Sequence, residues 1–266
     1  MKYDGIVCPH CGQALSEKDN MLKCAAGHSF DIAAAGYVNL LPPHKKVPGD
    51  NKEMVQARRF FLDRGGYSPL AERLAALIQG FRPAVLADVG CGEGYYTGRI
   101  RQQLSHCRVY GFDISKFALA AAAKRDREIA YCVANLHRLP LSDCFADAVL
   151  CCFCPIDEGE FARVLKPGGR LVLVSPGQMH LMELKRILYE APYENEEEAR
   201  CLEGFDRREE QRLTYTFSVE QAAELQALFA MTPYYWKTPP EGAARLAAYE
   251  SLAVTADFRI ELFEKK

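Results

Sequence analysis

The chain has 266 residues, a formal net charge of −2 and 49% hydrophobic residues, which allow one large domain with a small appendage. The charge gives no global signal for nucleic acid, no apolar run is long enough to cross a bilayer, and the first residues lack the apolar segment of a signal peptide. We therefore expect a cytoplasmic protein without a membrane partner. Its 11 cysteines fit a reducing compartment with one metal site better than a disulfide scaffold.

The first part of the chain carries four residues at the spacing of a metal site. Cys8 and Cys11 form a CxxC pair, 12 residues separate Cys11 from Cys24, and three separate Cys24 from His28. Zinc prefers four tetrahedral sulfur and imidazole ligands, and a complete protein set indicates a structural ion, because a catalytic zinc keeps one position open for water. We predict a zinc module over residues 1–40. The alternatives are unrelated core cysteines and a thiol redox switch.

The segment between the two ligand pairs, GQALSEKDNMLK, predicts a small hairpin with Asp19 and Asn20 in its turn. So short a module buries little apolar area, so the metal is expected to supply most of its folding free energy. His10, between the two cysteines, is expected to point outward, although it could compete with His28.

A linker and two helices are predicted next. Three prolines within residues 40–50 break regular structure, and the apolar spacing then predicts helices over 51–64 and 68–80. From Lys45 to Arg64 there are six basic and three acidic residues, a balance of +3. This basic stretch is either a solvated helix face or a surface that contacts phosphate groups.

Residues 84–97, AVLADVGCGEGYYT, form an apolar run that enters an acidic residue and a glycine-rich turn. Glycines let the backbone turn sharply and lie against a ligand. In a dinucleotide fold this loop would wrap a pyrophosphate at a helix N-terminus, where the Glu93 carboxylate would be unfavourable. S-adenosylmethionine has no phosphate, and its ammonium group suits a carboxylate. The loop therefore favours this cofactor, with contacts expected at Asp88, Gly90, Gly92 and Glu93.

The order of the following elements supports this interpretation. Taken alone, the glycines would also fit an ordinary strand-to-helix turn. Residues 107–112 predict a second strand that ends at Asp113, about 20 residues past the loop, where an acid holds ribose hydroxyls. A loop, an apolar strand, a helix, a GG turn and another strand follow. This succession resembles the class I methyltransferases, so we predict an α/β, Rossmann-like doubly wound sheet over residues 81–266, preceded by the linker and helices of residues 41–80.

Motifs along nearly the whole chain resemble one family, the bacterial 23S ribosomal RNA (guanine-N1)-methyltransferases of the RlmA type. These motifs are CPHCG, the CxxxH pair, GYVNLLP, PGDNKEMVQARRFFLDRGGY, DVGCGEGYYT, HLMELK and MTPYYW. The resemblance implies methylation of N1 of a guanine in a hairpin loop of domain II of 23S rRNA, with S-adenosylmethionine and zinc as cofactors. It also implies a homodimer whose cleft takes the RNA and, for some members, resistance to macrolide-type antibiotics.

The resemblance carries two further residues into the predicted site. Its zinc ligands fall on the four residues already named, and its cofactor contacts fall on Tyr67, Gly92, Glu93 and His180. His180 follows the predicted fifth strand, at the ligand-facing edge of the sheet. Without the family, Tyr67 would be read as a residue at a helix entry.

The chain lacks the Asn- or Asp-Pro-Pro-aromatic motif of adenine-directed methyltransferases; CCFCPIDEGE stands in its place. Chemistry on exocyclic amines is therefore disfavoured, and the cysteines of this segment are most simply buried strand residues. Guanine N1 carries a proton at neutral pH, so a base or a group that stabilises the O6-enolate should assist. Asp157, Glu158, Glu160 and His180 are equal candidates.

Other interpretations stay open at this stage. The aromatic residues of MTPYYW could stack on the base or pack in the core. The protein could also be a small-molecule methyltransferase, or a non-catalytic RNA-binding protein that uses the cofactor for structure.

Overall fold

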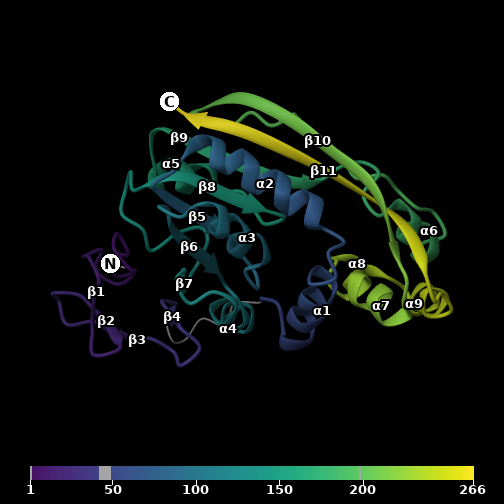
Figure 1. The fold of residues 1–266 in the computed structure, drawn as a ribbon, viewed down its shortest axis with the longest axis horizontal. Helices are drawn as coiled ribbons and strands as arrows, with labels where there is room; N and C mark the ends of the chain where they lie inside the picture. Colours follow the sequence, from purple (N-terminus) through teal and green to yellow (C-terminus); the bar gives the residue numbers. More distant parts are fainter. Residues whose placement is uncertain (1, 42–48, 198) are drawn as a thin grey trace.

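Within the residues that the computed structural model describes, 2–41, 49–197 and 199–266, the main body is an eight-stranded sheet (Figure 1). The strands lie in the order β10-β11-β9-β8-β5-β6-β7-β4. The central strands run parallel: β5 (Val85–Val89), β6 (Arg108–Asp113), β7 (Ala130–Val133), β8 (Ala146–Cys152) and β9 (Leu165–Pro176). The strand order reverses at β5, which pairs with β6 on one side and β8 on the other. Ligands are expected at the carboxyl ends of these strands.

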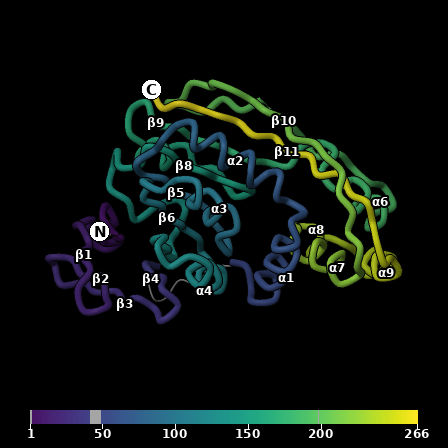
Figure 2. The backbone as a smooth tube through the Cα atoms, viewed as in Figure 1, coloured from purple at the N-terminus to yellow at the C-terminus, as the bar shows by residue number. Residues whose placement is uncertain are grey.

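A long antiparallel hairpin extends the sheet at one edge. Its strands are β10 (Phe205–Val219) and β11 (Leu252–Lys265), and β11 also pairs with β9. The helices inserted between the two strands are α7 (Ala222–Ala230), α8 (Tyr234–Lys237) and α9 (Pro240–Ala247). Figure 2 shows the hairpin arching over the molecule and ending at these helices, on the side opposite to the amino terminus.

Helices cover both faces of the sheet because its strands are apolar on both sides. In β5, Leu86 belongs to one buried cluster, whereas Val85, Ala87 and Val89 belong to a second. The helices that follow strands of the parallel part are α3 (Tyr95–Gln103), α4 (Lys116–Arg125), α5 (Glu158–Val164) and α6 (Met182–Leu188). In the described part of the chain, none of the helices has the length and apolar character needed to span a membrane.

The two helices predicted before the first central strand are present. The first, α1 (Lys52–Leu62), begins after Asn51, whose side chain accepts a hydrogen bond from the Met54 N–H at 2.8 Å. The second, α2 (Ser68–Phe81), has a proline in its first turn, where the missing N–H costs nothing. The predicted linker residues that lie outside the described part of the chain are Pro42, Pro43, Lys45, Lys46 and Pro48.

The amino-terminal module is a small antiparallel sheet of β1 (Ser16–Lys18), β2 (Met21–Lys23) and β3 (Ser29–Asp31). Asp19 and Asn20 turn the chain between the first two strands in left-handed backbone, with φ of 54° and 58°. The predicted hairpin is therefore confirmed. The next strand, β4 (Tyr37–Asn39), joins the edge of the main sheet parallel to β7.

The module shares a core with the main domain. Ile6 and Leu22 are fully buried in the same cluster as Tyr110 and Phe161. The Tyr110 hydroxyl also donates a hydrogen bond to the Asp4 carbonyl oxygen at 2.6 Å. This shared core stabilises the module in addition to a bound metal, which the sequence argument did not anticipate. The division of the chain into three units stays a prediction.

Candidate active site and metal centre

The predicted zinc ligands lie together in the amino-terminal module. The ligand atoms of Cys8, Cys11, Cys24 and His28 are all within 4.8 Å of one another. Cys11 Sγ and Cys24 Sγ are 3.7 Å apart, and His28 Nδ1 is 3.4 Å from Cys24 Sγ. A tetrahedral zinc with Zn–S bonds of about 2.3 Å separates its sulfur ligands by about 3.8 Å. The donor atoms and their spacing therefore fit this ion.

His10 lies beside this cluster and outside it. Its side chain is exposed, and its ring stacks on Phe30 with the centroids 5.8 Å apart. Among the described residues, the group of ligand atoms that could hold a metal includes His28 and leaves His10 out. This position agrees with the expectation that His10 points outward.

The loop between β5 and α3 has glycine at positions where a side chain would be strained. Gly90, Gly92 and Gly94 have φ of 76°, 55° and 78°. A Cβ on Gly90 would lie 2.6 Å from Cys154 Sγ, and one on Gly94 would lie 2.7 Å from the Tyr131 hydroxyl oxygen. The loop thus presents backbone without side chains, as close approach to a ligand requires.

Asp113 is held at the end of β6 by this loop. One carboxylate oxygen accepts a hydrogen bond from the Gly92 N–H at 3.0 Å, and the other accepts one from the Ser115 N–H at 2.8 Å. Burial raises the pKa of Asp113, and these two hydrogen bonds oppose the shift. Each oxygen has a second lone pair that can accept a hydrogen bond from a ribose hydroxyl.

Asp88 has a partner within the chain. It is 2% exposed, and the Thr97 hydroxyl on α3 lies 2.5 Å from its Oδ2. Burial raises the pKa of Asp88 to about 7, although the hydrogen bond from Thr97 opposes this shift. The Asp88 side chain therefore ties the end of β5 to the following helix.

Glu93 is a buried carboxylate whose Oε1 forms a long ion pair with Arg125. It is 2% exposed, and its Oε1 has no hydrogen-bond partner among the described residues. The guanidinium of Arg125 is 3.7 Å away. Burial raises the pKa of Glu93, and Arg125 and Arg58 oppose the shift. Oε1 therefore faces a positive charge without a hydrogen bond, and it keeps the capacity to accept one from a ligand donor such as an ammonium.

Tyr67 and His180 form a buried pair. The Tyr67 hydroxyl oxygen lies 3.1 Å from His180 Nε2, and His180 Nδ1 accepts a hydrogen bond from the Asp257 N–H at 3.2 Å. Since Nδ1 is an acceptor, the proton of the neutral ring lies on Nε2 and is donated to Tyr67. Burial lowers the pKa of His180 to about 4, so the ring is neutral at physiological pH.

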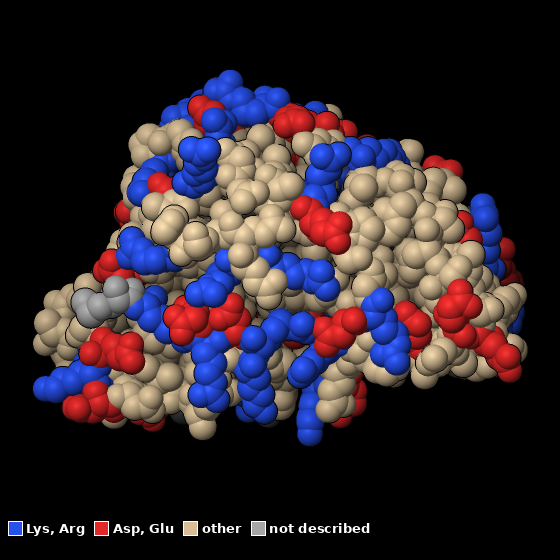
Figure 3. All heavy atoms as spheres, viewed as in Figure 1, with Lys and Arg blue, Asp and Glu red and all other residues tan. Residues whose placement is uncertain are grey.

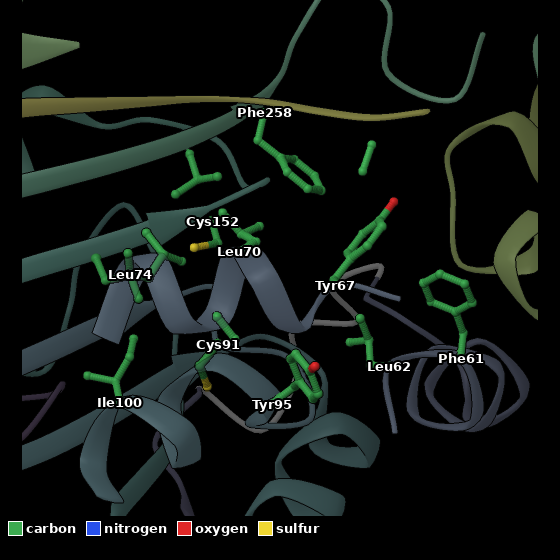
Figure 4. Packing of buried hydrophobic residues seen from close by; sticks show 14 of the residues in the cluster. Phe61, Leu62, Tyr67, Leu70, Leu74, Cys91, Tyr95, Ile100, Cys152 and Phe258 are labelled. Atoms are coloured by element: carbon green, nitrogen blue, oxygen red, sulfur yellow. The ribbon is translucent and has the colours of Figure 1, made fainter. Parts of the chain in front are cut away.

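Aromatic rings connect this pair with the glycine loop. The Phe258 ring lies 5.0 Å from that of Tyr67 and 4.8 Å from that of His180, between centroids. Phe153 bridges Phe258, at 5.7 Å, and Tyr96 of α3, at 6.4 Å. Figure 4 shows Tyr67 pointing from the start of α2 toward Phe258. A series of ring contacts therefore connects Tyr67 and His180 with α3, the helix that follows the glycine loop.

Comparison with known proteins identifies the family. Residues 6–48 match the family described as RlmA, N-terminal, and residues 86–169 match a methyltransferase domain. The chain is 36% identical to the 23S rRNA (guanine(748)-N(1))-methyltransferase of Streptomyces fradiae, over 91% of this chain and 89% of that protein. It belongs to the RlmA family of 23S rRNA (guanine-N1)-methyltransferases.

Two further relatives extend over 95% of this chain. They are 34% and 30% identical, come from Micromonospora griseorubida and Bacillus subtilis, and are covered over 95% and 94% of their own lengths. Both carry the name 23S rRNA (guanine-N(1)-)-methyltransferase provisionally. The matches confirm the predicted family, the enzyme class and the α/β methyltransferase fold. Together with the ligand cluster they confirm the predicted cofactors, S-adenosylmethionine and zinc.

The structure gives the RlmA-type site a residue that the sequence argument placed elsewhere. Arg58, within the predicted basic stretch, forms an ion pair with Asp50. The Asp50 carbonyl oxygen accepts a hydrogen bond from the Ser115 hydroxyl at 2.7 Å, and an Arg58 nitrogen lies 3.7 Å from where a Cβ on Gly92 would be. The Arg58 side chain of α1 therefore lies against the glycine loop, and Asp50, just before α1, contacts the start of α4. The count of charged residues in the sequence could not show this position of Arg58, because the position depends on which elements pack together.

Three carboxylates that were candidates for proton transfer already form ion pairs or hydrogen bonds within the chain. Glu160 forms an ion pair with Arg163 at 2.6 Å. Asp157 accepts a hydrogen bond from the Glu160 N–H and lies 2.7 Å from His137 Nδ1. Glu158 Oε2 accepts a hydrogen bond from the Glu203 N–H. Each of these carboxylates has a structural role around α5.

The motif MTPYYW divides between core and surface. Tyr234 is buried, and its ring lies 6.3 Å from that of Tyr189. Tyr235 and Trp236 are 46% and 66% exposed. Burial in the core thus explains Tyr234, whereas Tyr235 and Trp236 lie largely at the surface.

Proposed function

We propose that this enzyme transfers the methyl group of S-adenosylmethionine to N1 of a guanine in 23S rRNA. The observation that carries the proposal is the 36% identity to the Streptomyces fradiae enzyme over both the zinc module and the methyltransferase domain. A small-molecule methyltransferase would not need the amino-terminal module. A non-catalytic RNA-binding protein that uses the cofactor for structure would share the loop, and the relatives named as methyltransferases disfavour it.

We propose specific roles for the cofactor residues. Asp113 accepts hydrogen bonds from the ribose hydroxyls, because its oxygens keep free lone pairs beside the loop. Gly90 and Gly92 bring the backbone against the cofactor. Glu93 Oε1, which has no hydrogen-bond donor among the described residues, accepts the ammonium group. Asp88 keeps the strand and helix in position. When bound, S-adenosylmethionine supplies an electrophilic methyl group.

Tyr67 and His180 are proposed to close the other side of the cofactor pocket. His180 does not act as a general base, because Nδ1 already accepts a hydrogen bond and Nε2 carries the proton. The Tyr67 hydroxyl accepts from His180 and keeps its own proton for donation to a bound molecule. The pair is thus a fixed donor in a buried, weakly solvated position.

The RNA partner is proposed to be a hairpin loop of domain II. A guanine in a loop is partly unstacked, which reduces the cost of placing it in a pocket. Figure 3 shows Lys and Arg side chains along the lower edge of this face, over α4 and α1, with acidic side chains among them. We propose that this edge and the zinc module grip the hairpin and that two chains form a homodimer. The ribosomal substrate also favours the predicted cytoplasmic location.

Methylation of an unmodified 23S rRNA transcript tests the proposal. Zinc-loaded protein, S-adenosylmethionine and transcript should give N1-methylguanine at one position, which mass spectrometry of nuclease fragments locates. Protein that binds the cofactor and leaves the RNA unmethylated would contradict the proposed reaction. Methyl transfer to a small molecule without RNA would favour the first alternative, and tight RNA binding without methyl incorporation would favour the second.

A further inference from the structure

Phe153 has two features that cost stability. It follows the last residue of β8 and is 43% exposed, although it is a large apolar side chain. Its φ is 56°, in the left-handed region that residues other than glycine rarely adopt. A bulky residue in such a conformation is strained, and residues of this kind cluster at functional sites. Neither exposure nor strain contributes to the folding of the chain.

The turn at Phe153 is fixed by its neighbours. The Phe153 N–H still donates to the Val174 carbonyl oxygen of β9 at 3.0 Å, so pairing continues beyond the end of the strand. The next side chain, Cys154, places its Sγ 3.1 Å from the Val89 carbonyl oxygen and directly against Gly90. The left-handed residue is therefore held beside the cofactor loop, and its ring is directed outward.

One part of the Phe153 ring is supported by other rings and the remainder faces solvent. Its neighbours are Tyr96 and Phe258. Tyr96 lies in the first turn of α3, just after the glycine loop. Phe258 contacts both Tyr67 and His180. Phe153 thus joins the two groups of predicted cofactor residues. An aromatic surface that is supported on one side and exposed on the other can accept a planar ligand.

The topology places the methyl acceptor near the end of β8. The proposed ribose contact, Asp113, ends β6, and the glycine loop for the amino-acid portion follows β5. The next strand across the switch point is β8, which ends at Cys152, directly before Phe153. A nucleobase that approaches the sulfonium from the side opposite the ribose therefore reaches this ring.

We propose that the acceptor guanine stacks on the Phe153 ring. This inference rests on the proposed function and names the residue that orients its substrate. The lone pair that N1 uses after loss of its proton lies in the plane of the base, so methyl transfer requires this plane to be aligned with the sulfonium. A fixed stacking surface sets the plane, whereas hydrogen bonds at the edge of the base set its rotation.

Substitution at Phe153 tests the proposal. Phe153→Leu keeps an apolar side chain and removes the π face, so kcat/KM for unmodified 23S transcript should fall about 10- to 100-fold, the range expected for loss of one base–aromatic stack. Phe153→Tyr and Phe153→Trp should keep kcat/KM within about threefold. The matched control is Tyr249→Leu, because Tyr249 has a similar exposed fraction, 42%, and lies beyond α9. Its kcat/KM should be unchanged.

Cofactor binding and fluorescence separate stacking from folding. Calorimetry should give the same S-adenosylmethionine Kd for the Phe153 variants and the wild type. Trp236 is the one tryptophan of the chain, so Phe153→Trp in a Trp236→Phe background gives a single reporter. A guanine-containing hairpin should quench its fluorescence more strongly than the same hairpin with the acceptor guanine replaced by an abasic site. Equal kcat/KM for Phe153→Leu and wild type, or no quenching, would overturn the stacking role while the wild-type methylation stands. Absence of methylation by the wild type would instead overturn the proposed function.

Discussion

The Tyr67 hydroxyl and His180 Nε2 lie 3.1 Å apart, although 113 positions separate the two residues. Tyr67 directly precedes α2, and His180 lies between β9 and α6. The Asp257 N–H of β11 fixes the orientation of the imidazole from the other side. The two hydrogen bonds of His180 therefore join a helix start, a loop and a strand of the antiparallel hairpin at the proposed cofactor pocket.

Replacement of this histidine should change the pH dependence of stability. The pKa of His180 is lowered by burial from 6.5 to about 4, so the unfolded chain binds a proton more readily than the folded chain. The contribution of the neutral ring to the free energy of unfolding is therefore complete above about pH 6.5. Up to about 3 kcal/mol of this free energy is lost as the pH falls from 6.5 to 4. His180→Gln should flatten this part of the curve of unfolding free energy against pH. Chemical denaturation at several pH values measures it.

The exposed His106 supplies the control for that experiment. His106→Gln should leave the dependence on pH unchanged. If His180→Gln and wild type lose equal stability between pH 6.5 and 4, His180 is not the neutral buried group described here.

Asp113→Asn should weaken cofactor binding. The substitution removes the negative charge and turns one hydrogen-bond acceptor into a donor that faces the Gly92 or Ser115 N–H. Hydrogen bonds to a charged group contribute about 1.5–3 kcal/mol, so the Kd for S-adenosylmethionine should rise about 10- to 100-fold. Calorimetry measures this change. Asp206→Asn, on the half-exposed edge of β10, should bind like wild type, and an unchanged Kd for Asp113→Asn would remove Asp113 from the ribose site.

The sequence predicted those parts of the site that depend on local spacing. Cys8, Cys11, Cys24 and His28 are close in the chain, so their order already indicates the geometry of a metal cluster. The glycine loop and Asp113 follow strands in a regular succession, and the fold brings the ends of neighbouring parallel strands to one edge.

Features that depend on packing between distant elements could not be predicted in this way. The partner of Arg58 became visible only when α1 was placed over the glycine loop. The proposal that His180 does not act as a base rests on the Asp257 N–H at Nδ1, a contact with a strand far along the chain. Phe153 appeared in the sequence as part of a cysteine-rich strand, and its left-handed backbone has no signature in residue type.

Gly90→Ala should disrupt the cofactor loop through a steric clash. The added Cβ would lie 2.6 Å from Cys154 Sγ, in a residue with φ of 76°. Strain and clash together should lower the free energy of unfolding by about 1–3 kcal/mol and weaken S-adenosylmethionine binding. Gly168 has nearly the same φ, 74°, with no atom near its Cβ position. Gly168→Ala therefore reports the backbone strain alone, and an equal effect of both substitutions would mean that the contact with Cys154 has no role.

Loss of one zinc ligand should separate RNA methylation from cofactor binding. Cys24→Ser should release the metal, which elemental analysis measures, and should lower Tm by about 5 °C or more, because bound metal stabilises the folded module. The loop that follows β5 is built from main-domain residues, so the Kd for S-adenosylmethionine should change by no more than about threefold. Methylation of 23S transcript should fall much further, because the zinc module is proposed to hold the RNA.

Cys107→Ser is the matched control, because Cys107 is a free cysteine of the main domain outside the metal cluster. It should keep its zinc, its Tm and its methylation rate. If Cys24→Ser loses zinc and still methylates the transcript at the wild-type rate, the module does not contribute to RNA binding. If cofactor binding is lost together with the metal, the core that Ile6 and Leu22 share with the main sheet transmits the disorder of the module to the cofactor loop.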